Sequence, residues 1–80
     1  MNKLYQAALA HFEAKRNEAI ATLDIYFNHS VGIGEHSGLL EEVAKWTETL
    51  ANADDSIEAL KRHFTSQGQL RENEEVAVRR

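Results

Sequence analysis

The chain of 80 residues contains no cysteine, no proline and only four glycines. The absence of cysteine excludes disulfide frameworks and thiolate metal sites. The absence of proline leaves long stretches in which a helix can run without interruption. The chain also lacks an apolar run of 18 residues, and its first residues lack the basic-then-apolar layout of a secretory signal. We therefore expect one small domain in the cytoplasm, with no membrane association.

Two long segments, about residues 2–28 and 37–67, carry apolar residues at helical spacing among residues that favour helices. The glycine-rich turn between them, at residues 29–36, has the backbone freedom that a chain reversal needs. The sequence therefore predicts an all-α fold, in which a single domain over residues 1–68 forms an antiparallel two-helix hairpin.

The ends of these segments carry residues typical of helix boundaries. The side-chain oxygen of Asn2 can accept hydrogen bonds from the first free backbone N–H groups of a helix. Gly68 is a residue of the type that ends helices. The polar segment that follows, residues 69–80, carries six charged side chains and no apolar stripe. We expect it to be a mobile tail or a short helix.

The apolar residues of the second segment recur at alternating steps of three and four, as in the seam between packed helices. The first segment repeats this pattern less regularly, with Arg16 at a core-like position. Its charge can reach water past the aliphatic stem or pair with an acid across an interface. We expect the core and interface to consist of Leu9, Phe12, Ala19, Leu23, Tyr26, Val43, Trp46, Leu50, Ile57, Leu60 and Phe64.

The chain has more apolar residues than one seam between two helices can cover. That seam cannot hold all of the large apolar side chains, namely Tyr5, Ile20, Phe27, Trp46 and Phe64. Each large side chain left exposed forfeits about 1.5–3 kcal/mol of burial. Two hairpins packed as a four-helix bundle would cover them. We therefore expect a homo-oligomer, with a dimer favoured, and the alternative is docking onto a different protein.

Three potential metal ligands lie in the turn. His29, Glu35 and His36 offer imidazole and carboxylate groups that suit zinc, iron or manganese, and a dimer would bring two turns together. However, no His-Glu-x-x-His or Glu-x-x-His spacing presets a binding geometry. The simpler interpretation makes His36 a helix cap and His29 a solvated residue. We expect no metal and no cofactor.

Catalysis and nucleic-acid binding are both disfavoured. Ser30 and Ser37 lie near histidines, but no orienting acid and oxyanion hole accompany them in a recognisable order. A Gly-x-Gly within residues 31–34 follows no strand and lacks the third glycine of a dinucleotide loop. Between residues 35 and 64, seven acidic side chains stand against three basic ones, which repels phosphate. We expect neither an enzyme nor a nucleic-acid-binding protein.

A Val-Gly-Ile-Gly-Glu-His turn occupies residues 31–36 and opens the second helix, which continues into Ala53-Asp54-Asp55. With these features, residues 26–64 resemble a segment of short uncharacterised proteins of T4-like tailed phages, especially marine and cyanobacterial ones. Where those relatives often carry proline after the histidine, this chain has Ser37. The resemblance implies no known activity. It implies a phage accessory protein that acts in the cytoplasm of an infected bacterium.

Two hypotheses for function follow. The first is a non-enzymatic module for helical oligomerisation and protein interaction, which binds itself and a host or viral protein. The second is a small metal- or ligand-binding protein that uses His29, Glu35 and His36. Metal analysis of the purified protein separates the two, because only the second predicts a stoichiometric metal.

Overall fold

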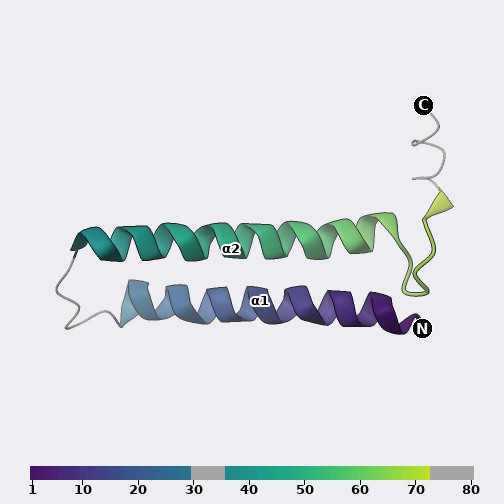
Figure 1. Ribbon diagram of the computed structural model, residues 1–80, viewed down its shortest axis with the longest axis horizontal. Helices are drawn as coiled ribbons and strands as arrows, with labels where there is room; N and C mark the ends of the chain where they lie inside the picture. Colours follow the sequence, from purple (N-terminus) through teal and green to yellow (C-terminus); the bar gives the residue numbers. More distant parts are fainter. Residues whose placement is uncertain (30–35, 73–80) are drawn as a thin grey trace, which may run out of the picture.

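The computed structural model describes residues 1–29 and 36–72, apart from the side chains of residues 36 and 37. Within these ranges the chain folds into two helices, α1 over Lys3–Asn28 and α2 over His36–His63. The helices lie side by side and run in opposite directions, so that the start of α1 and the end of α2 share one end of the molecule (Figure 1). The predicted all-α antiparallel hairpin is confirmed.

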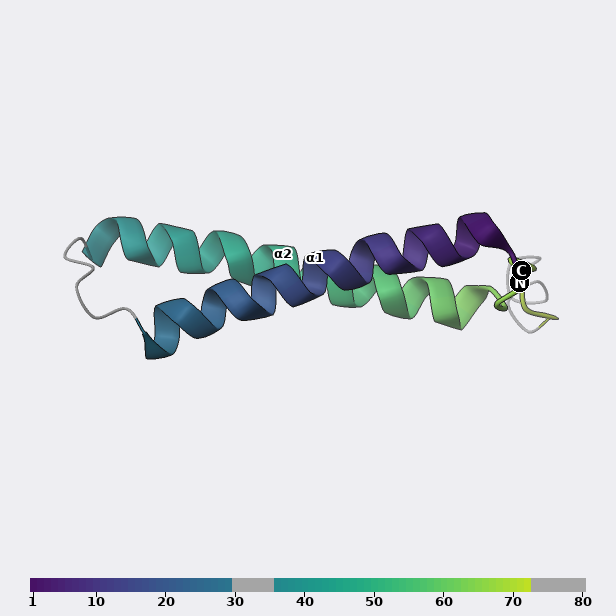
Figure 2. The same cartoon turned by 90° about the horizontal axis from the view of Figure 1, so that it is seen from below.

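The hairpin is a single layer of helices. Its principal extents are 53 × 29 × 15 Å, and the shortest is close to the diameter of one helix with its side chains, about 10–12 Å. The two helices cross near their middles (Figure 2). A crossing brings the helix axes closest at one point, so side chains there are covered better than those toward the ends.

Asn2 starts α1 in the way that the sequence predicts. Its backbone is extended, with φ −73° and ψ 121°, and its side chain accepts a hydrogen bond from the backbone N–H of Tyr5 at 2.9 Å between Oδ1 and N. At the other end, the His29 N–H donates to the carbonyl of Ile25 at 2.8 Å. Both ends of α1 therefore have backbone groups satisfied within the described chain.

After α2 the chain folds back over the end of the hairpin. Phe64 forms an isolated antiparallel bridge with Leu70, and the turn between them includes Gly68 at φ +78°. The Asn2 N–H donates to the carbonyl of Ser66 at 3.2 Å, and the Arg71 N–H donates to the carbonyl of His63 at 2.9 Å. We call this returning segment, residues 64–71, the clasp.

The clasp changes where the second helix ends. The sequence placed that end near residue 67, with Gly68 as the terminator, but α2 stops at His63. The reason is pairing beyond the helix, because Phe64 forms the bridge to Leu70 and the carbonyl of Ser66 accepts the hydrogen bond from Asn2 at the other end of the chain. Gly68 serves the turn of the clasp instead. Residues 69–72 belong to this folded end, and residues 73–80 lie outside the described part of the chain.

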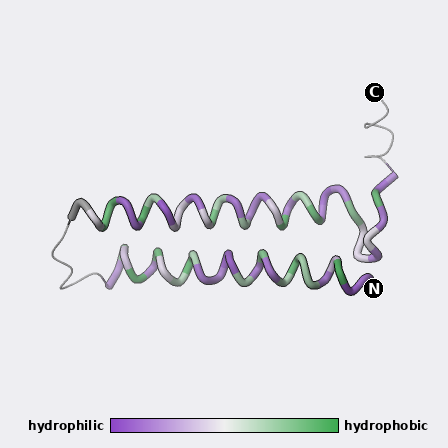
Figure 3. The backbone as a smooth tube through the Cα atoms, in the orientation of Figure 1, coloured by the Kyte–Doolittle hydropathy of each residue, from purple (hydrophilic) through white to green (hydrophobic). Residues whose placement is uncertain are grey.

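Apolar and polar residues alternate along both helices (Figure 3). Of the eleven side chains expected in the core, none is exposed: Ala19, Leu23 and Ile57 are buried, and the other eight are half-buried. Ala53 is the fourth buried residue. In the described ranges, neither helix is long and apolar enough to cross a membrane.

Candidate functional site

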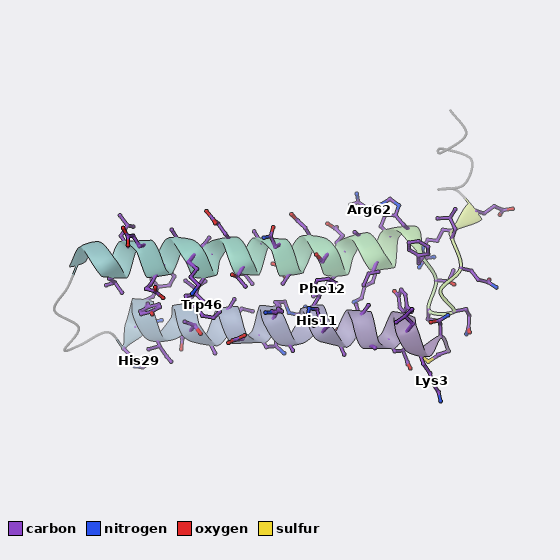
Figure 4. All side chains as sticks on the ribbon, viewed as in Figure 1. Lys3, His11, Phe12, His29, Trp46 and Arg62 are labelled. Carbon is purple, nitrogen blue, oxygen red and sulfur yellow. The ribbon has the colours of Figure 1, made fainter. Side chains whose placement is uncertain are left out.

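The side chains of the seam come from both helices and point at each other across the crossing. Figure 4 shows Phe12 of α1 and Trp46 of α2 between the helices, whereas Lys3 and Arg62 point away from them. The ring of Trp46 is half-buried, and Nζ of Lys45 lies 5.4 Å from its centroid. Phe12 meets His11 edge-on, with ring centroids 5.0 Å apart. The seam is thus apolar within and closed at its margins by amphipathic side chains.

A second set of apolar residues lies outside the seam. Ile20 and Phe27, two of the five residues that the sequence could not fit together in one seam, are exposed, while Tyr5, Trp46 and Phe64 are half-buried. Exposed side chains of this size are informative when they are grouped. The exposed large apolar residues are Met1, Leu4, Ile20, Ile25, Phe27, Leu40 and Leu70.

Three of these residues gather on one flank near the turn. Two hydrogen bonds set the alignment of the two helices, Asn2 with Ser66 and Tyr26 with Glu42. In each pair the residue numbers add up to 68, so a residue of α1 is level with the residue of α2 whose number completes that sum. By this register, Phe27 of α1 is level with residue 41 of α2, next to Leu40.

Ile20 lies seven residues before Phe27, on the same side of α1. The exposed fractions of Ile20, Phe27 and Leu40 are 48%, 65% and 71%. We call these three residues the turn-end patch.

The same flank becomes charged toward the clasp. Glu13 lies seven residues before Ile20 on α1, and Asp54 lies fourteen residues after Leu40 on α2. In the register above, Glu13 is level with residue 55, next to Asp54. A shallow depression on this part of α2 is lined by Asp54, Ile57, Glu58, Lys61 and Arg62. The turn half of this flank therefore carries three exposed apolar side chains together with the exposed carboxylate of Asp24, which lies four residues after Ile20, and the other half is charged.

The opposite flank carries a groove that has Phe12 and Ala53 in its lining and polar side chains from both helices. His11 and Lys15 of α1 face Thr49, Asn52 and Ser56 of α2 across it. Toward the clasp the groove becomes more apolar, with Leu60, Phe64 and Leu70 in its lining. The described side chains of this groove present no grouping of three metal-ligating residues, and the arrangement resembles the open edge of a helix pair more than a built pocket.

The proposed metal ligands of the turn are only partly visible in the structure. His29 follows the last residue of α1 and is exposed. Glu35 and the side chain of His36 lie outside the described residues. Among the residues that are described, no group of three or more His, Asp or Glu side chains could hold a metal ion.

Sequence reasoning missed Leu40 as a member of the apolar flank. The signal was available, because Leu40 follows Leu39, which is half-buried, and so lies about 100° around the helix from it. What the sequence did not show was the register that sets Leu40 beside Phe27. Comparison of the chain with known protein families, curated proteins and solved structures returned no match.

Proposed function

We propose that this chain is a non-enzymatic helical module for self-association and protein interaction, with a homodimeric four-helix bundle as its favoured state. One observation carries the proposal: the hairpin is a single layer of helices, and among the side chains that the structure describes only Ala19, Leu23, Ala53 and Ile57 are buried. Stable domains bury their apolar faces between at least two packed layers. A second hairpin would supply the second layer.

The free energy gained by burying the exposed apolar side chains is large relative to the stability of so small a domain. At about 0.05–0.15 kcal/mol per residue, a chain of this length is stable by about 4–12 kcal/mol. Full burial of one large apolar side chain contributes about 1.5–3 kcal/mol. Covering several side chains such as Phe27 and Leu40 is therefore a substantial gain, even after the entropic cost of association.

The charge of the chain is consistent with an apolar contact between copies. The formal net charge is −4, so two copies repel each other weakly at long range and salt screens that repulsion. Association through apolar surface should then persist at high salt. A complex with a basic partner protein, which is the competing interpretation, should weaken as salt rises.

The cellular setting of the proposal comes from the phage resemblance of residues 26–64. We place the protein among accessory proteins of T4-like phages that act in the host cytoplasm. A self-associating hairpin suits this role, because it needs no cofactor and presents two copies of any binding surface to a host or viral protein.

Sedimentation equilibrium between about 1 and 100 μM tests the proposal, with circular dichroism recorded on the same samples. We expect a monomer–dimer equilibrium in this range and a helical spectrum throughout. A single-chain mass at all concentrations, with full helicity and cooperative unfolding, would show that one hairpin is sufficient and would refute self-association.

A further inference from the structure

We infer that the clasp, residues 64–71, is a conformational latch: it opens and closes as one unit over the end of the hairpin, while the rest of the hairpin stays folded. The inference goes beyond the proposed function and holds for a single copy of the chain. The clasp runs from the end of α2 to the start of α1 (Figure 1). It therefore contacts the last turn of one helix and the first turn of the other.

Asn2 links the clasp to the start of α1. Its backbone N–H donates to the carbonyl of Ser66 at 3.2 Å, and its side-chain oxygen accepts from the N–H of Tyr5 at 2.9 Å. The same side chain packs closely against Gly68, where an added Cβ would lie 2.8 Å from Nδ2 of Asn2. Opening of the clasp therefore removes two contacts from the residue that caps α1, and we expect the cap to loosen with it.

Arg71 links the clasp to the end of α2. Its backbone N–H donates to the carbonyl of His63 at 2.9 Å, and its side-chain Nε donates to the carbonyl of Lys61 at 2.9 Å. Both carbonyls belong to the last turn of α2, where the helix has no further N–H groups to offer them. The clasp thus caps α2 with its own far end.

Hydrogen bonds inside the clasp join these two links. The N–H of Thr65 donates to the carbonyl of Gln69 at 2.9 Å, and its carbonyl accepts from the N–H of Gly68 at 2.8 Å. Its hydroxyl accepts from the N–H groups of Gln67 and Gln69 at 3.2 and 3.3 Å. Because one residue holds both sides of the turn, the clasp should move as a single piece.

The clasp has little apolar burial to keep it closed. None of residues 64–71 is buried, and Leu70 is 40% exposed. Segments with few buried apolar contacts and exposed backbone hydrogen bonds open locally, at free energies well below that of global unfolding. The buried residues of the described chain all lie within the two helices, at Ala19, Leu23, Ala53 and Ile57. The clasp should therefore open before the hairpin unfolds.

Opening of the clasp changes the surface at this end of the seam. Leu60 of α2 is half-buried and lines two neighbouring depressions. Gly68 of the clasp lines the first of them, and Leu70 lines the second. When the clasp opens, each depression loses one wall and Leu60 becomes more accessible to solvent. The latch thus controls how much of the apolar seam is exposed.

Amide hydrogen exchange of the full chain, followed by NMR, tests the latch. In the wild type, the amides of Thr65 and Gly68 should be protected at least about tenfold less than that of Ala53. Arg71→Ala removes the Nε donor, and one hydrogen bond is worth about a two- to tenfold change in an equilibrium constant. We expect this variant to speed exchange at Thr65, Gly68 and Tyr5 by a similar factor, at least about threefold.

Tyr5 is the decisive readout, because its N–H bonds to Asn2 at the opposite end of the chain. The control is Gln67→Ala, which truncates an exposed side chain of the turn and keeps the backbone N–H that bonds to Thr65. This control should change exchange by no more than about twofold. Circular dichroism should show Arg71→Ala to be as helical as the wild type, since Arg71 is exposed.

Three results would overturn the latch. If Thr65 and Gly68 were as well protected as Ala53, the clasp would open only when the whole hairpin unfolds. If Arg71→Ala left Tyr5 unchanged, the clasp would not be one unit. The reverse variant, Asn2→Ala, removes the α1 cap and should speed exchange at Thr65 and Gly68 at least about threefold. Unchanged exchange there would refute the coupling from the other side.

Thiol labelling tests the exposure of the seam, since the chain contains no cysteine. Leu60→Cys places a thiol at the half-buried position beside the clasp, and Ala59→Cys places one at an exposed neighbouring position. Addition of Arg71→Ala should speed labelling of Leu60→Cys at least about threefold and change that of Ala59→Cys by no more than about twofold. An unchanged rate for Leu60→Cys would show that the clasp does not control this surface.

Discussion

The clearest test of the seam is the removal of Ile57. This side chain is only 6% exposed, and truncating a buried isoleucine to alanine costs about 2–5 kcal/mol, depending on how far the site collapses. The higher helix propensity of alanine offsets a few tenths of a kcal/mol of this loss of stability. The net loss of about 2–4 kcal/mol is a large part of the stability of an 80-residue domain. At about 4–8 °C per kcal/mol for a domain of this size, it corresponds to a fall in melting temperature of about 8–32 °C.

Ile25→Ala is the matched control for this experiment. It makes the same chemical change on α1 at a side chain that is 53% exposed. Thermal unfolding followed by circular dichroism, at one fixed protein concentration, should show a shift of no more than about 3 °C for this variant. If Ile25→Ala and Ile57→Ala lowered the melting temperature equally, burial at the helix crossing could not be what stabilises the fold.

Three further predictions concern the clasp, the seam and the turn. Gly68→Ala should destabilise the protein by about 1–2 kcal/mol in thermal unfolding, because Gly68 has φ +78° and a Cβ there would lie 2.8 Å from Nδ2 of Asn2. In its control, Gly38→Ala in α2, the added Cβ has no other atom within 4 Å, so this variant should stabilise the protein by about 0.5–1 kcal/mol. If Gly38→Ala were the less stable of the two variants, the turn geometry would be refuted. Leu50→Asp should lose helicity and dimer mass together, because it puts a carboxylate into the seam, and a folded, stable monomer would contradict the packing. Elemental analysis of purified protein should find no stoichiometric zinc or iron, whereas a metal lost on His29→Ala would support the alternative ligand-binding function.

The local features of the fold could be predicted because they depend on neighbours in the chain. Apolar spacing of three and four residues identified both helices, and the cap formed by Asn2 needs only a backbone N–H three residues away. The side chains expected in the seam are buried or half-buried for the same reason, since helical periodicity decides which residues share a face. The metal hypothesis stays a prediction, because two of its three ligands lie outside the described residues.

The end of α2 could not be predicted in this way. It depends on the bridge between Phe64 and Leu70 and on the hydrogen bond from Asn2 to Ser66, which joins residues 64 positions apart. The helix propensities of residues 64–67 contain no information on such contacts. Judged from neighbouring residues alone, a helix that ends at Gly68 is favourable. Long-range pairing overrode that preference.

By itself, the sequence determined two amphipathic helices, a reversal between them and an excess of apolar side chains, since composition and periodicity suffice for each of these. Only the tertiary structure decided the register, which sets Phe27 of α1 beside Leu40 of α2, and thereby which excess residues gather into one patch and which stay apart. The physical reason is that periodicity assigns a residue to a face of its own helix, whereas adjacency across two helices depends on their crossing and on their alignment along the axis.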